Sequence, residues 1–212
     1  MFLKLTPHRK RLIRKVFSPL KRIGLKKEFS IISNNCWGGR IYDKFGLKYL
    51  SPTIGIAMQP LEYSKFISNL DYYLSLEPVP IIEKLNRIDN EHGNYPVMLG
   101  DIEFSFVHYR DVYDGINKWS NRKKRIVKDN IIVKMSYTPK GVEEDEIILN
   151  SFAKVHYKKI LFTCDKSLKE RNDLGLVVVF PEYDDNCKII NEIAKSDKLL
   201  KLKELKKIIN KE

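Results

Sequence analysis

The sequence has few cysteines and no long apolar run, and each shortage excludes a class of protein. Its three cysteines, Cys36, Cys164 and Cys187, are an odd number without CxxC spacing. They predict reduced thiols rather than a disulfide framework or a zinc ribbon. No run approaches the roughly eighteen apolar residues of a membrane-spanning helix, and the N-terminus lacks a continuous apolar signal core. We therefore expect a protein of the cytoplasm.

Common catalytic and ligand-binding motifs are missing as well. The sequence contains no GxGxxG, GxxxxGK[ST], GxSxG or HExxH pattern, which argues against dinucleotide, P-loop, common hydrolase and zincin functions. Its histidines and cysteines lack the spacing of a zinc signature, so we predict no metal site. Nothing in the sequence identifies a cofactor.

Acidic residues are absent from residues 1–27, which carry ten Lys or Arg. The other 185 residues are nearly neutral, with 29 basic and 27 acidic side chains. Apolar residues recur at helical spacing within this first segment, so it predicts a basic amphipathic helix. Such helices bind anionic membrane surfaces, which would place the protein at the inner face of the membrane. Packing of this helix on the rest of the chain remains an alternative, and nucleic-acid binding is a less favoured one.

The remaining chain has the composition of a globular protein, with 43% hydrophobic and 11% aromatic residues. Strand-like runs alternate with helical patterns, which predicts one α/β domain over residues 28–187 with a mixed, mainly parallel sheet flanked by helices. Residues 188–212 predict a C-terminal amphipathic helix packed on or beside it. Strands are expected at residues 29–33, 54–58, 95–99, 102–108, 131–135, 159–163 and 176–180, and helices at 60–76, 111–128 and after 143.

Three of these strands have particular signatures. Gly100-Asp101 separates two strand-like runs and predicts a β-hairpin. The β-branched run Val177–Val179 predicts a central strand covered on both faces. The glycines after residue 37 predict a turn that leads into a short helix near Arg40.

A polar turn follows the first apolar strand, and it is the most informative segment of the sequence. In open α/β sheets, ligands bind outside the carboxyl ends of the strands. The turn and two further positions supply the predicted substrate-binding residues: Asn34, Asn35, Trp37, Gly38, Gly39, Tyr109 and Arg122.

Cys36 in this turn and His108 at the end of a later strand are the candidate catalytic residues. If the two strands are parallel neighbours, His108 accepts the thiol proton and backbone N–H groups near Gly38 and Gly39 hold an oxyanion, which is acyl-transfer chemistry. Alternatively, Cys36 binds a ligand or packs as a small apolar residue, and His108 lies at the margin of the core. No carboxylate is assigned as a third member.

Several phrases of the sequence also resemble a known family, the domain of unknown function DUF1919. The phrases are Phe29–Gly39, Leu50–Thr53, Tyr95–Val97, Leu99–Ile102, His108-Tyr109, Lys118-Trp119, Arg122 and Asp129-Asn130. The resemblance covers residues 28–180 and implies a bacterial α/β protein, often labelled an exopolysaccharide biosynthesis protein and sometimes an acetyl- or glycosyltransferase. It supplies no catalytic residues.

These observations predict a transferase of exopolysaccharide or capsule biosynthesis that acts on a sugar or activated sugar, through acyl transfer at Cys36 and His108. The first alternative is a non-catalytic sugar- or nucleotide-binding partner of a glycosyltransferase. The second is a nucleic-acid-binding protein that depends on residues 1–27.

Overall fold

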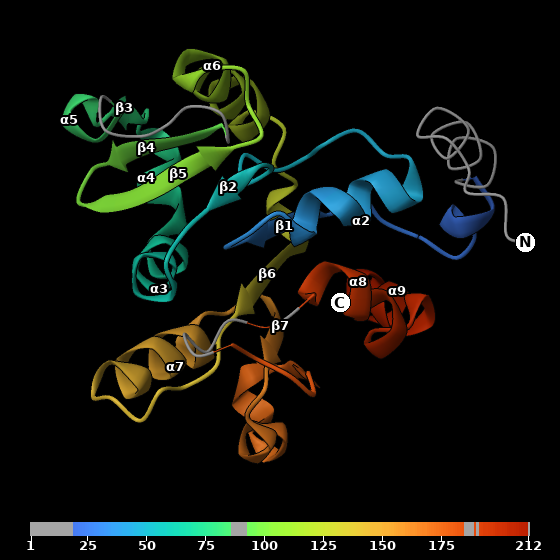
Figure 1. Ribbon diagram of the computed structural model, residues 1–212. Helices are drawn as coiled ribbons and strands as arrows, with labels where there is room; N and C mark the ends of the chain where they lie inside the picture. The colour runs from blue at the N-terminus through green and yellow to red at the C-terminus, as the bar shows by residue number, and fades with distance from the viewer. Residues whose placement is uncertain (1–18, 86–92, 185–188, 190, 212) are drawn as a thin grey trace, which may run out of the picture.

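A parallel sheet of four strands forms the centre of the computed structural model, which describes residues 19–85, 93–184, 189 and 191–211 (Figure 1). Its strand order is β1 (Ser30–Ser33), β6 (Ile131–Ser136), β7 (Lys158–Thr163), β8 (Leu176–Val179). Ser30 lies opposite Ile131 and Ser33 opposite Lys134, so the first strand pairs with one from the second half of the chain.

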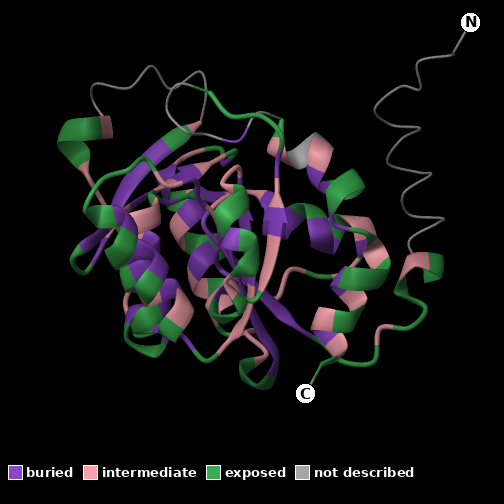
Figure 2. Cartoon of the chain, turned by 90° about the horizontal axis from the view of Figure 1, so that it is seen from below, coloured by how far each residue is buried: buried purple, intermediate pink, exposed green. Residues whose placement is uncertain are grey.

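Alternate side chains of this sheet enter two separate apolar cores. Ile32 and Val133 point into the first core, and Ile31 and Ile132 into the second. The first core is covered by α3 (Pro60–Ser68), α4 (Leu70–Ser75) and α7 (Glu144–Lys154), and the second by α2 (Trp37–Phe45) and α9 (Leu202–Asn210). Figure 2 shows buried residues along the strands and exposed residues on the outer faces of the helices.

A second, antiparallel sheet packs into the first core. Its order is β2 (Ile56–Ala57), β5 (Ile102–Val107), β4 (Asn94–Leu99), β3 (Val79–Pro80). Leu99 pairs with Ile102 across Gly100-Asp101, which confirms the predicted hairpin. Phe104 of β5 stacks on Trp119 of α6 (Val112–Lys123) with ring centres 5.3 Å apart, which holds this helix on the sheet. The other elements are α5 (Ile82–Leu85), α8 (Glu192–Leu199) and the 3₁₀ helices η2 (Lys128–Asn130), η3 (Lys166–Glu170) and η4 (Asn172–Leu174).

The predicted α/β class is confirmed, with a parallel and an antiparallel sheet in place of one mixed sheet. The prediction of a central strand at Val177–Val179 is wrong, because among the described strands β8 lies at the edge and β6 and β7 take the central positions. Only Val178 of β8 is buried. β-branched residues suit a pleated, partly buried strand wherever it lies in a sheet, so the run could not fix its position.

Two predicted helices are each interrupted. The helix expected over 60–76 is divided at Asn69, whose ψ of 52° is not helical. The C-terminal helix is two helices, α8 and α9, because Leu200 and Lys201 are extended. Most of the predicted N-terminal helix, and the boundary predicted at residue 187, lie outside the described residues.

Candidate active site at the carboxyl edge of the parallel sheet

The carboxyl ends of β1 and β6 are adjacent, and the chain leaves them toward opposite faces of the sheet. After β1 it enters α2, whose Trp37 and Phe45 pack in the second core. After β6 it enters α7, whose Leu149 and Phe152 pack in the first. Open α/β sheets bind ligands where neighbouring connections diverge in this way. The fold therefore directs attention to the ends of these two strands.

Asn34 extends the pairing of β1 and β6 by one residue. Its backbone N–H donates to the carbonyl of Lys134. Its side-chain amide then acts as a further peptide group, donating to the Ser136 carbonyl at 3.2 Å and accepting from the Ser136 N–H at 2.9 Å. Asn34 is buried, and its side chain satisfies backbone groups of the sheet.

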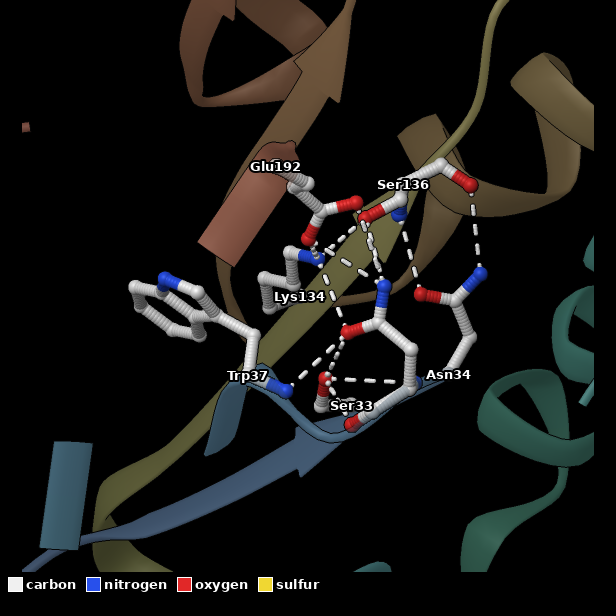
Figure 3. Close-up of polar contacts among 7 residues, drawn as sticks. Ser33, Asn34, Trp37, Lys134, Ser136 and Glu192 are labelled. Carbon is white, nitrogen blue, oxygen red and sulfur yellow. Dashed lines mark hydrogen bonds and ion pairs between the residues drawn. The ribbon is translucent and has the colours of Figure 1, made fainter. Parts of the chain in front are cut away.

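Asn35 connects the end of β1 to two charged residues, Lys134 and Glu192, both of which are labelled in Figure 3. Its Oδ1 accepts from the N–H of Trp37, the first residue of α2, at 3.2 Å, and from Lys134 Nζ at 3.1 Å. Its Nδ2 donates to Ser136 Oγ at 3.0 Å and to both carboxylate oxygens of Glu192 at 3.2 Å. Asn35 therefore joins β1, β6 and α8 in one polar cluster.

Lys134 is the charged centre of this cluster, and its side chain has no exposed surface. It lies on β6 in the alternation that faces the second core, 4.5 Å above the ring centre of Phe162 and 5.7 Å from that of Trp37. Nζ donates to Glu192 Oε1 at 2.6 Å, to Asn35 Oδ1 and to Ser136 Oγ. All three ammonium hydrogens thus have acceptors, as a buried lysine requires.

Burial and ion pairing shift the pKa values of Lys134 and Glu192 in opposite directions. Burial lowers the pKa of Lys134, although the Glu192 carboxylate opposes the shift. Burial alone would raise the pKa of Glu192, but the charge of Lys134 and hydrogen bonds from Lys134, Ser136 and Asn35 lower it overall. Glu192 is therefore ionised at neutral pH. A buried ion pair at the edge of a sheet is typical of functional sites, where burial and partner charges shift pKa values.

The two glycines after Trp37 lie within α2, not in a turn before it. The prediction that a turn precedes a helix near Arg40 is therefore wrong, because the helix begins at Trp37, directly after its N-cap residue Cys36. A Cβ at Gly38 would lie 3.2 Å from the Cγ2 of Ile31, and one at Gly39 would lie 3.2 Å from the Cγ2 of Ile54. The glycines let α2 approach β1 and the segment before β2. Trp37 is buried against Phe162, so it stabilises the core.

Cys36 is partly buried at the junction of β1 and α2. Burial raises the pKa of its thiol, the charge of Lys134 opposes this, and the charge of Glu192 adds to it. The thiol is therefore predominantly protonated at neutral pH, and the environment does not favour a thiolate nucleophile.

Tyr109 and Arg122 meet at the carbonyl of Ile54. Both donate to that oxygen, and Arg122 Nη1 also donates to the Tyr109 hydroxyl at 2.7 Å. Burial raises the pKa of Tyr109, Arg122 opposes the shift, and charges at Asp114 and Cys36 add to it. Because Gly39 packs on Ile54, three predicted binding residues from distant segments lie around one turn.

His108 does not lie beside the strand that leads to Cys36. β1 belongs to the parallel sheet and β5 to the antiparallel one, so the parallel arrangement on which their meeting depended is absent from the described strands. β5 ends at Val107, and His108 is exposed with a φ of 66°. Its backbone turns into the left-handed region as its N–H donates to the Gly93 carbonyl, so it leaves the alternation of Phe104 and Phe106.

Sequence reasoning missed Lys134, Ser136 and Glu192. A signal for Lys134 was present, because it is the one charged residue in the apolar strand Ile131–Ser136. Its partner Glu192 lies in a lysine-rich C-terminal segment with no distinguishing pattern. Among the described residues, no three His, Cys, Asp or Glu side chains are placed to hold a metal ion. In that same part of the chain, no helix combines the length and apolar character needed to cross a membrane.

Comparison with known proteins supports the resemblance seen in the sequence. The model of the family "Domain of unknown function (DUF1919)" matches residues 8–210, which extends beyond the 28–180 expected. A Haemophilus influenzae protein described as "Uncharacterized protein" is 29% identical over 146 residues. That match covers 68% of this chain and 66% of the relative, so the chain spans just under two thirds of the relative's length.

Proposed function

We propose that this chain, which belongs to the family of the domain of unknown function DUF1919, binds a sugar or activated sugar at the carboxyl edge of β1 and β6. The convergence of Asn35, Ser136 and Glu192 around the buried Lys134 carries this proposal. Amide, hydroxyl and carboxylate groups in fixed positions are the partners that sugar hydroxyls need. Asn35, Ser136 and Glu192 are only partly buried, so they are within reach of a ligand.

The position of Arg122 favours an activated sugar over a free sugar as the ligand. Its guanidinium lies 5.0 Å from the ring centre of Tyr49 and uses Nη1 toward Ile54 and Tyr109. An oriented arginine is suited to the phosphates of a sugar nucleotide. The role that we propose is therefore that of a sugar-nucleotide-binding partner of a glycosyltransferase. We place this role in the assembly of surface polysaccharide, which is the setting that the sequence resemblance implies.

Acyl transfer through Cys36 and His108 has less support than binding. The pKa of Cys36 is raised chiefly by burial, and His108 follows the end of β5, a strand of the antiparallel sheet. In a binding site, Cys36 contributes shape and not a thiolate.

Isothermal titration of the full chain with UDP-glucose, glucose and acetyl-CoA tests the proposal. We expect saturable binding of UDP-glucose that Ser136→Ala weakens by about 1 kcal/mol, the net value of one hydrogen bond. Arg122→Gln should weaken the binding of UDP-glucose more than the binding of glucose. Ser151→Ala on α7 is the matched control and should change nothing.

Cys36→Ser separates binding from catalysis. Affinity for UDP-glucose should stay within about twofold, since a hydroxyl replaces a neutral thiol of similar shape. Binding of acetyl-CoA together with acetylation of Cys36 would instead establish the acyl-transfer reaction. If neither sugar binds at the highest soluble concentration, the proposal is wrong.

A further inference from the structure

The two ends of the described chain form one basic surface, which we call the terminal face and define as residues 19–27 together with 201–211. It carries nine Lys or Arg and one acidic residue, Glu204. Figure 1 shows the blue segment and the red helix α9 at the same side of the molecule. Outside this face the described chain carries acidic and basic residues in similar numbers, so the charge is localised.

Hydrogen bonds fasten the two segments to each other. The Lys26 N–H donates to Asn210 Oδ1 at 2.9 Å, and Asn210 Nδ2 donates to the Gly24 carbonyl at 2.6 Å. Lys206 Nζ donates to the Ile23 carbonyl at 2.7 Å. Residues far apart in sequence therefore present their side chains from one fixed surface.

Four lysines of α9 and its C-terminal end crowd one part of this surface. A hollow of about 660 Å³ is lined by Gly24 and by Lys203, Lys206, Lys207 and Lys211. Burial lowers the pKa of the nearby Lys158, and the charges of Lys27 and Lys211 lower it further. Glu204 is occupied in accepting from the Lys201 N–H at the start of α9. A surface with this mutual repulsion is stabilised by an anionic partner.

Two large apolar side chains project beside the lysines. Leu20 is 60% exposed and Ile23 is 69% exposed, although the carbonyl of Ile23 is held by Lys206. On the opposite side of α9, Leu205 and Ile209 are buried in the second core. The terminal face thus combines a lysine layer with apolar side chains that the fold leaves in water.

We propose that the terminal face binds the surface of an anionic lipid bilayer. Its lysines would contact phosphate headgroups, while Leu20 and Ile23 enter the boundary of the acyl chains, as in interfacial helices. A nucleic acid offers the same phosphates but no apolar layer for Leu20 and Ile23, so the exposed pair favours the membrane. Such binding would hold the carboxyl-edge site near membrane-bound substrates.

Vesicle sedimentation of the full chain tests this surface. We expect binding to phosphatidylcholine vesicles that contain phosphatidylglycerol, and none to phosphatidylcholine alone. Lys203→Ala and Lys207→Ala each remove an exposed charge that lines the hollow, and each should weaken binding about fivefold. Lys166→Ala and Lys169→Ala on η3 form the matched control and should bind like the parent protein.

The apolar pair distinguishes the membrane from a nucleic acid. Leu20→Ser combined with Ile23→Ser should reduce vesicle binding at least tenfold, because the apolar contact with the bilayer is lost. The same variant should leave any retention of duplex DNA unchanged. Equal binding of both vesicle types, vesicle binding that survives loss of the apolar pair, or DNA binding tighter than vesicle binding would overturn the proposal.

Discussion

Lys134 shows how one charged side chain can be accommodated within an apolar core. An isolated ammonium group would be strongly disfavoured there, but Glu192, Asn35 and Ser136 accept from it, and the Phe162 ring lies against it. These partners come from four separate segments of the chain. The position of Lys134 is therefore specified by tertiary structure, and its partners could not be read from local sequence.

Cys36 should behave as a weakly reactive thiol. Because burial raises its pKa, alkylation by iodoacetamide should reach half its maximal rate at a pH above the ordinary value of about 8.5. Mass spectrometry of the alkylated peptide across a pH series measures this midpoint.

His108→Ala is the control for that titration. His108 is exposed and lies after a strand of the other sheet, so its loss should leave the Cys36 midpoint unchanged. A midpoint below the ordinary value that moves upward in His108→Ala would restore the activated thiol that the sequence predicted.

At the level of elements, α6 is held close to the antiparallel sheet by a glycine. A Cβ at Gly115 would lie 2.5 Å from the Phe106 ring, and Phe106 is fully buried. Gly115→Ala should therefore destabilise the fold by about 1–3 kcal/mol from overpacking, less the ~1 kcal/mol by which alanine favours a helix. Urea unfolding followed by circular dichroism gives the difference.

Asn117→Ala on the exposed side of the same helix isolates the helix-propensity effect. It should leave the protein unchanged or slightly more stable, because only the local preference for helix increases. If Gly115→Ala were as stable as Asn117→Ala, the close approach of α6 to Phe106 would be refuted.

The sequence predicted that most helices and strands exist, but it predicted their boundaries and the pairing of the strands less well. Apolar periodicity located the strands β1, β4, β5, β6 and β7 and the helices α3, α6 and α7, because each buries a regular stripe of side chains. It missed the start of α2, since glycines usually mark turns and here they permit close packing. It also missed the sheet positions of β5 and β8, which depend on pairing between distant strands.

Only the part of the candidate site that follows β1 could be predicted from the sequence. The polar turn after β1 is visible in sequence, and the structure places Asn35 and Cys36 at the sheet edge as expected. Tyr109 and Arg122 also lie near it, although no local pattern shows that both donate to Ile54. Glu192 reaches the site from α8, and that contact depends on how the whole chain closes around the sheet.

For the whole molecule, stability should fall in acid partly through Glu192. Its pKa is lowered in the folded state from an unfolded value near 4.5, so its contribution is complete above that pH. The contribution is lost as the pH falls through the lower folded value, because the carboxylate must then bind a proton. Chemical unfolding at neutral and acidic pH should show this decrease.

Glu192→Gln should lower the free energy of unfolding at neutral pH by roughly 3–5 kcal/mol, since it leaves Lys134 buried without its counter-charge. The difference from the parent protein should shrink in acid, where Glu192 is protonated anyway. Glu182→Gln is the matched control: Glu182 pairs with Lys195 but is well exposed, so its loss should cost at most about 1 kcal/mol. Equal effects of the two variants would show that the Lys134 pair does not stabilise the fold.

The pairing of β1 with β6 also determines when this protein can fold during synthesis. The ribosome makes the residues of β1 early, yet their partner begins at Ile131. The hairpin of β4 and β5 can close first, because its strands are adjacent in the chain. Until β6 emerges, Ile31 and Ile32 have no neighbouring strand, so the nascent chain exposes an apolar segment that chaperones would bind.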